Sequence, residues 1–115
     1  MKLTEEQFNI IKKIFKGIKE KGFLPNNSVF SIESEEDEKR EYSKENLEDC
    51  SYIKKKELYF STYGEIYPNS NEDEIIGVTV TFIFNKNFLL QRFLIEVHDW
   101  DSEDTELTLN NYLTQ

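Results

Sequence analysis

Residues 78–84 form the clearest β pattern of the chain, because apolar side chains recur there at every second position. The recurring residues are Val78, Val80, Phe82 and Phe84, which alternate with Thr79, Thr81 and Ile83. A period of two residues is typical of a strand that turns one face toward a core. The sequence therefore predicts a strand in this segment.

The segments on either side share this period, which predicts an antiparallel meander. Upstream, from residue 57, Leu58, Phe60, Thr62 and Ile66 alternate with Tyr59, Ser61, Tyr63, Glu65 and Tyr67. Gly64 is a candidate β-bulge within that strand. Downstream, Asn85-Lys86-Asn87 is short enough for a hairpin and leads into residues 88–97, where Phe93, Ile95 and Val97 share a face.

The N-terminal segment predicts an amphipathic helix. Thr4 followed by Gln7 is a capping box, and Leu3 with Phe8 has the spacing of a hydrophobic staple. Gly22 and Pro25 end the helix. Its apolar stripe consists of Phe8, Ile11, Ile14, Phe15 and Ile18, with lysines mostly on the other side.

Together these elements predict an α+β fold, in which the N-terminal helix packs on an antiparallel meander of three to five strands. The 115 residues fit a single domain, 1–115. Residues 29–32 predict a short strand, and 33–49 form either an acidic loop or a polar helix, with Ser43 as a candidate N-cap near Leu47. Residues 105–113 fit either a strand or a helix.

The net charge of −9 bears on the choice of partner. Binding to nucleic acid or to anionic membranes requires an excess of Lys and Arg, so neither is expected. The charge is uneven, since residues 33–49 carry nine acids against three bases, whereas residues 2–21 carry six Lys against three Glu. No segment has the apolar length of a membrane span, and the N-terminus lacks the apolar stretch of a signal peptide, which indicates a cytoplasmic protein.

The sequence shows no catalytic motif, so we expect a protein that is not an enzyme and has no cofactor. The glycines at 17, 22, 64 and 77 are too scattered for a phosphate-binding loop, and Cys50 and His98 are single residues of their kind. Asp99, Asp101 and Glu103 have the spacing of a calcium loop. However, Asp104 and Asn110 stand where that loop needs glycine and glutamate, so no metal site is predicted.

Two groups of residues are candidates for binding a partner. The first is acidic: it consists of Glu96, Asp99, Asp101, Glu103 and Asp104 beside Trp100, the only Trp of the chain, and of Glu72, Asp73 and Glu74 in a separate turn-rich loop. The second is a stripe of Tyr59, Tyr63 and Tyr67 on the strand face opposite Phe60. Aromatic residues supply contact energy, and charge speeds encounter. The alternatives are a solvated acidic loop and a tyrosine face covered by a second helix.

In size, charge and layout the chain resembles the small acidic α+β immunity proteins that bacteria encode beside their toxins. The strand end with acid, Trp and acid, from Glu96 to Asp101, is similar to a feature of some small bacterial families of this kind. The resemblance implies inhibition of a cognate toxin with a basic surface, such as a nuclease, by occlusion. A regulatory or adaptor module that binds another cytoplasmic protein remains the alternative, and the oligomeric state is open.

Overall fold

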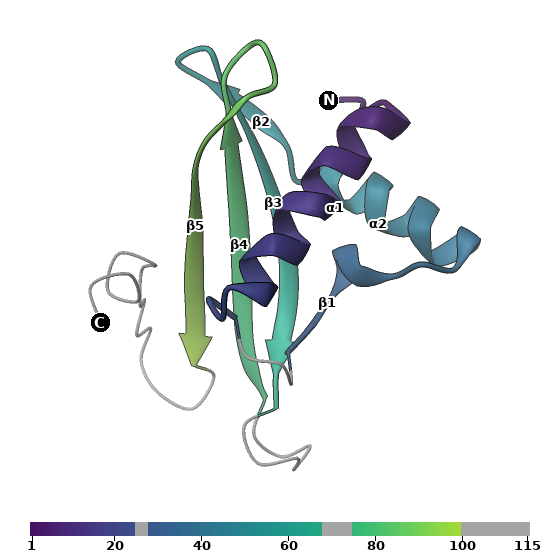
Figure 1. The fold of residues 1–115 in the computed structure, drawn as a ribbon, viewed down its shortest axis with the longest axis vertical. Helices are drawn as coiled ribbons and strands as arrows, with labels where there is room; N and C mark the ends of the chain where they lie inside the picture. Colours follow the sequence, from purple (N-terminus) through teal and green to yellow (C-terminus); the bar gives the residue numbers. More distant parts are fainter. Residues whose placement is uncertain (25–27, 68–74, 100–115) are drawn as a thin grey trace.

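The computed structural model describes residues 1–24, 28–67 and 75–99, and within them it confirms an α+β fold with an antiparallel meander (Figure 1). The two α-helices are α1 (Glu5–Glu20) and α2 (Asp37–Asp49), and a short 3₁₀ helix, η1, spans Ser31–Glu33. The strands are β1 (Ser28–Phe30), β2 (Tyr52–Lys54), β3 (Glu57–Ile66), β4 (Ile76–Phe84) and β5 (Leu90–Asp99). None of the helices in these residues is long and apolar enough to cross a membrane.

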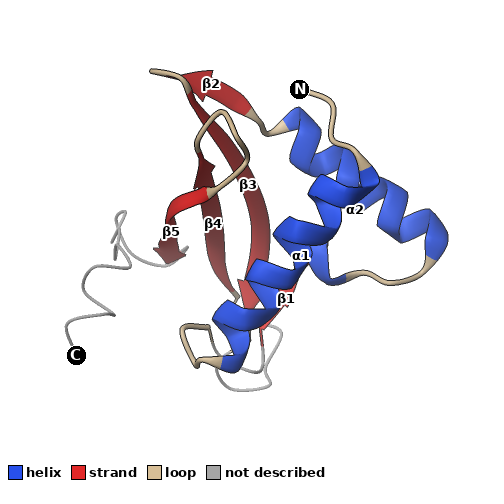
Figure 2. Cartoon of the chain, turned by 45° about the horizontal axis from the view of Figure 1, so that its top comes forward, coloured by secondary structure: helices blue, strands red, loops and turns tan. Residues whose placement is uncertain are grey.

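The sheet has the order β1-β3-β4-β5, and β2 also pairs with β3. The short strands β1 and β2 share one side of β3, with β1 at its C-terminal end and β2 at its N-terminal end. All four pairings are antiparallel. The long strands β3, β4 and β5 are therefore the predicted meander, and β5 lies at the other side of the sheet (Figure 2).

Helix α1 begins as the sequence predicts. The Thr4 hydroxyl accepts a hydrogen bond from the Gln7 backbone N–H at 3.1 Å, and the Gln7 side chain accepts one from the Thr4 N–H at 3.0 Å. This reciprocal capping box satisfies two N–H groups that have no partner within the helix. Gly22 follows the helix with φ +80°, the left-handed conformation expected of a glycine at a helix end.

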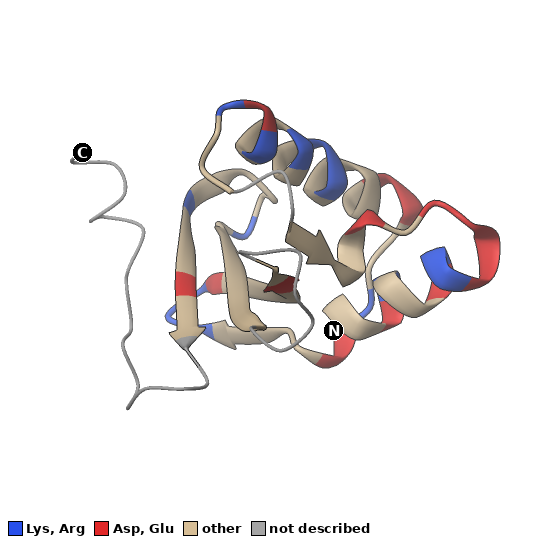
Figure 3. Ribbon diagram, turned by 90° about the horizontal axis from the view of Figure 1, so that it is seen from below, with Lys and Arg blue, Asp and Glu red and all other residues tan. Residues whose placement is uncertain are grey.

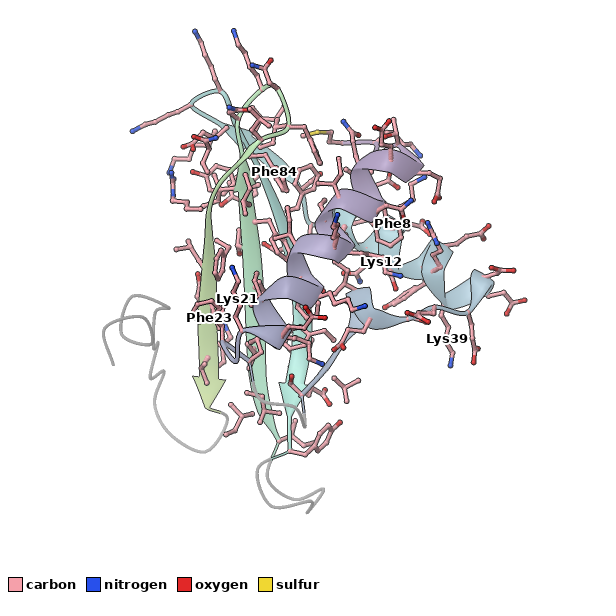
Figure 4. All side chains as sticks on the ribbon, in the orientation of Figure 1. Phe8, Lys12, Lys21, Phe23, Lys39 and Phe84 are labelled. Carbon is pink, nitrogen blue, oxygen red and sulfur yellow. The ribbon has the colours of Figure 1, made fainter. Side chains whose placement is uncertain are left out.

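A single cluster of buried side chains joins both helices to one face of the sheet. Phe15 of α1 lies edge-on to Phe82 of β4 and to Phe30 of β1, with ring centroids 6.4 and 5.0 Å apart. Leu47 of α2 belongs to the same cluster and is 1% exposed. Phe8 and Phe84 are also members of the cluster, and Arg40 of α2 lies 5.5 Å from the centroid of the Phe8 ring. Lys39 projects away from α2 (Figure 4). Both helices therefore cover the same face, which we call the core face.

The acidic segment 33–49 contains a polar helix rather than a loop alone, and polar contacts fasten α2 to its neighbours. Ser43, the candidate N-cap, instead lies inside α2, where its hydroxyl donates to the carbonyls of Ser31 and, at 2.8 Å, Lys39. Arg40 forms an ion pair with Glu5 of α1 at 2.6 Å. Because residues 37–49 bring only Leu47 into the hydrophobic cluster, α2 depends on such contacts more than α1 does.

Two local predictions differ from the structure, and one strand was not predicted. Gly64 is not a bulge, since it pairs in register with Val78, and the register of the β3–β4 pair is unbroken around it. Ile32, placed in the strand by the sequence pattern, belongs to η1. Strand β2 was not predicted, because its residues are exposed throughout and give no apolar alternation.

Candidate functional site

The sheet face opposite the helices, which we call the open face, holds two of the three predicted tyrosines. Tyr59 and Tyr63 alternate with the buried Phe60 and Thr62, so their side chains lie on the side away from α1 and α2. Neither helix lies on this side, because α1 and Leu47 of α2 pack into the hydrophobic cluster on the core face. Within the described residues, the alternative of a tyrosine face covered by a second helix is therefore wrong.

The register of the sheet arranges the open face in rows that cross three strands. The rows are Tyr59–Ile83–Arg92, Ser61–Thr81–Leu94, Tyr63–Thr79–Glu96 and Glu65–Gly77–His98. Directly opposite side chains in a sheet lie about 4.5–5.5 Å apart at Cβ, so each row is a line of neighbours. The structure thus brings the predicted residues Tyr63 and Glu96 into one row, although 33 positions separate them in the sequence.

An aromatic and charged group lies at the end of the open face near β2. Tyr52 of β2 stacks on Tyr59, with ring centroids 4.5 Å apart. Arg92 reaches from β5 to β3, where it donates to Glu57 at 3.1 and 3.3 Å and to the Tyr59 hydroxyl at 3.3 Å. Ile83 stands between these strands in the same row and is fully buried, so the guanidinium and the tyrosine ring form a cover above it.

The middle of the open face carries hydroxyl groups. The Ser61 and Thr81 side chains share a hydrogen bond at 3.0 Å. Tyr63, next along β3, is 41% exposed. Partial burial of its phenol, with a smaller contribution from the negative charge of Glu65, raises the pKa of Tyr63 above its ordinary value. Tyr63 therefore stays protonated at neutral pH and can donate a hydrogen bond to a partner.

Tyr67, the third tyrosine of the stripe, follows β3 directly. Its hydroxyl donates to Glu65 at 2.6 Å, so the ring is held close to the last row of the open face. At the same end, the Glu96 carboxylate lies 3.9 Å from the His98 ring nitrogen. This end of the sheet thus offers carboxylates beside aromatic and imidazole rings.

Much of the predicted acidic group lies outside the described residues, namely Glu72, Asp73, Glu74, Trp100, Asp101, Glu103 and Asp104. The described chain does show where these segments start. Ile76 begins β4, Asp99 ends β5, and the two are directly paired. The loop before β4 and the segment after β5 therefore leave the sheet at the same end.

The opposite end of the sheet is basic, a feature that sequence reasoning missed. The β2–β3 turn contains Lys55 and Lys56, and Lys86 lies in the β4–β5 loop at the same end, because Leu58 pairs with Phe84. Both turn lysines have positive φ, 51° and 66°, a conformation that usually requires Asn or Gly. The run Lys54-Lys55-Lys56 was a visible signal, but without a turn residue it does not predict a hairpin.

Other titratable groups form no reactive constellation in the described part of the chain. Cys50 is exposed, and its thiol lies 4.0 Å from the Asn46 side-chain amide oxygen. No group of three or more His, Cys, Asp or Glu side chains in these residues could hold a metal ion. A groove of about 450 Å³ between α1 and η1 is lined by lysines and glutamates together with Phe15 and Ile32, and Lys19 and Glu33 pair across it at 2.7 Å.

Charge is segregated among the elements. Acidic residues gather on α2 and the segment that precedes it, and lysines lie along α1 (Figure 3). On the open face Arg92 pairs with Glu57, and Glu65 and Glu96 are the other acids of its rows. A comparison with protein-family models, curated proteins and solved structures finds no significant match to this chain.

Proposed function

We propose that this chain is a non-catalytic binding protein whose open sheet face holds a protein partner. The observation that carries the proposal is a group of three tyrosines on that face, with no described helix above them. Tyr52 lies on β2, and Tyr59 and Tyr63 lie on the adjacent strand β3. Tyrosine combines a large apolar ring with a hydroxyl donor and has few rotatable bonds, so it gives contact area at low entropic cost.

The rigidity of the face supports this role. Tyr59 is held by the Tyr52 ring and by the Arg92 guanidinium, and the Ser61 and Thr81 hydroxyls are hydrogen-bonded to each other. Groups that are ordered before binding lose less conformational entropy in the complex. A partner can therefore use these residues without first arranging them.

We further propose that the partner is a bacterial toxin and that the chain is its immunity protein. The support is the charge of −9, which favours a partner with a basic surface, together with the resemblance in size and layout. In this function the chain occludes the toxin, for example by covering the phosphate-binding cleft of a nuclease. The alternative function is a regulatory or adaptor module, which would use the same face to bind a protein other than a toxin.

The test is a binding measurement with the product of the neighbouring gene, by calorimetry, combined with a toxicity assay. Tyr59→Ala and Tyr63→Ala should each weaken binding by about 30-fold, the size of an interface hot spot. Tyr42→Ala is the matched control, because Tyr42 is 62% exposed but lies on α2.

The outcomes separate the parts of the proposal. Binding without protection from toxicity would favour the adaptor function over the immunity function. Absence of binding would sink the toxin as partner. If only Tyr42→Ala weakened binding, the open face would be the wrong surface.

A further inference from the structure

The outer edge of β5 is the longest unpaired strand edge in the described part of the chain. Strand β5 spans ten residues, and β4 is its one partner among residues 1–24, 28–67 and 75–99, whereas β1 and β2 cover the far side of β3. Natural proteins blunt a free edge with proline, lysine or a bulge. Residues 92–99 contain neither proline nor lysine, and the one irregularity of the β4–β5 pair lies before them, between Ile83 and Phe84.

The central residues of this edge are complementary to themselves when read in the opposite direction. The segment is Arg92-Phe93-Leu94-Ile95-Glu96, a cation and an anion at the ends, two large apolar residues inside them, and Leu94 in the middle. In an antiparallel pair of two such segments centred on Leu94, Arg92 stands opposite Glu96 and Phe93 stands opposite Ile95. Every pair is then favourable, because unlike charges and apolar side chains face each other.

The faces of the sheet also match in this arrangement. A two-fold axis perpendicular to the sheet keeps the core face of both copies on the same side. Phe93 and Ile95 alternate toward the core face, and Ile95 is 3% exposed. Arg92, Leu94 and Glu96 alternate toward the open face. The apolar pairs therefore continue the two cores, and the charged pairs lie on the open side.

The charged groups are accessible for such pairing. The Arg92 side chain is 51% exposed, and its bonds to Glu57 and Tyr59 leave other guanidinium N–H groups for a second acceptor. The Glu96 side chain is 35% exposed, and its ion-pair contact within the described residues is His98 at 3.9 Å. Glu96 thus retains acceptor capacity for an arginine from outside.

From these observations we infer that two copies of this chain associate through antiparallel pairing of their β5 edges, with Leu94 of one copy opposite Leu94 of the other. The pairing satisfies the backbone groups of the free edge and joins the two sheets into one. The rows of the open face then continue across the axis, so that the tyrosines of both copies lie on one continuous surface. This inference does not depend on the proposed function.

Sedimentation velocity over a concentration series tests the dimer. The chain has a mass of 13.7 kDa, and the weight-average mass should rise toward twice that value with concentration. Glu96→Arg and Arg92→Glu should each weaken self-association by about tenfold or more, because each places two like-charged pairs across the axis. Glu45→Arg makes the same charge change as Glu96→Arg on the exposed surface of α2 and should leave association unchanged.

Mixing the two β5 variants gives the decisive result. A copy with two arginines and a copy with two glutamates have only opposite charges across the axis. The mixture should therefore form a heterodimer more tightly than either variant associates with itself. Circular dichroism of each variant shows whether it is folded. A wild-type chain that stays monomeric at every concentration overturns the inference, and so does a mixture that fails to associate.

The register is tested by cysteine cross-linking in a Cys50→Ser background. Leu94→Cys places two thiols opposite each other at the axis and should give a disulfide-linked dimer under mild oxidation. His98→Cys is the control, because it lies four positions along β5 from the axis residue, so that the two thiols of a dimer are far apart. A cross-link through residue 98 but not through residue 94 would overturn the proposed register.

Discussion

Two Gly→Ala substitutions of opposite expected sign test the packing of the core face. Gly64 of β3 pairs with Phe30 of β1, and the aromatic ring lies over the glycine. A Cβ added at Gly64 would stand 2.5 Å from Cγ and 2.6 Å from Cε1 of Phe30, whereas a Cβ at Gly17 of α1 would meet nothing within 4 Å. Gly64 therefore provides close approach, and Gly17 provides nothing that alanine lacks.

The magnitudes follow from these distances. Phe30 is 3% exposed and lies against Phe15, so it cannot move away without disturbing the core. Overpacking of this kind costs about 2–3 kcal/mol, and the lower entropy of the unfolded alanine chain offsets about 0.7 kcal/mol. We expect Gly64→Ala to lower the free energy of unfolding by about 2 kcal/mol. Gly17→Ala should raise it by about 1 kcal/mol through helix propensity.

Thermal and urea unfolding measure both effects. An unfolding entropy near 0.24 kcal/mol/K for 115 residues converts the changes into a Tm about 8 °C lower for Gly64→Ala and about 4 °C higher for Gly17→Ala. In a double-mutant cycle, Phe30→Ala should remove most of the cost of Gly64→Ala, because the clash is with that ring. Additive effects of Gly64→Ala and Phe30→Ala, or a neutral Gly64→Ala, would refute this account of the packing.

Three further predictions concern the helix cap, the strained turn and the perturbed tyrosine. Thr4→Ala should lower the free energy of unfolding by about 1 kcal/mol in urea titrations, because it removes half of the capping box. Replacing Lys55 and Lys56 with Asn-Gly should raise the same quantity by about 1 kcal/mol, because both lysines have positive φ. Ultraviolet titration should show a tyrosine that ionises above the usual range and is lost in Tyr63→Phe. Since the folded pKa of Tyr63 is raised, its contribution to stability is present below the unfolded pKa and declines as pH rises through the folded pKa.

The elements that could be predicted from sequence are those with a local cause. Helix α1 has its cap at Thr4 and an apolar stripe within one segment, so neighbours in sequence determine it. The meander also has a local cause, because the alternation of apolar residues along β4 already separates a core face from an open face. Tyr59 and Tyr63 could be placed on one face for the same reason.

The elements that sequence reasoning missed have causes elsewhere in the chain. Strand β2 is exposed throughout and follows from its pairing with β3 across a turn of two lysines. The start of α2 at Asp37 has no side-chain cap, and Ser43 bonds to Ser31 of η1, which sequence distance hides. The side of the sheet that α2 covers depends on where Leu47 packs. A single apolar residue in the sequence does not predict which face of the sheet the helix will cover.

The acids of α2 and the tyrosines of the open face have different roles in the proposed complex. The acids of α2 belong to a helix that packs on the core-face side, whereas Glu57 on the open face is neutralised by Arg92. Exposed charges act mainly on the rate of encounter, and about 0.1 M salt screens their attraction beyond about 10 Å. Contacts of tyrosine rings resist dissociation and respond little to salt. Salt should therefore slow association with a basic partner and change the dissociation rate only slightly. Tyr63→Ala should instead speed dissociation and change the association rate only slightly.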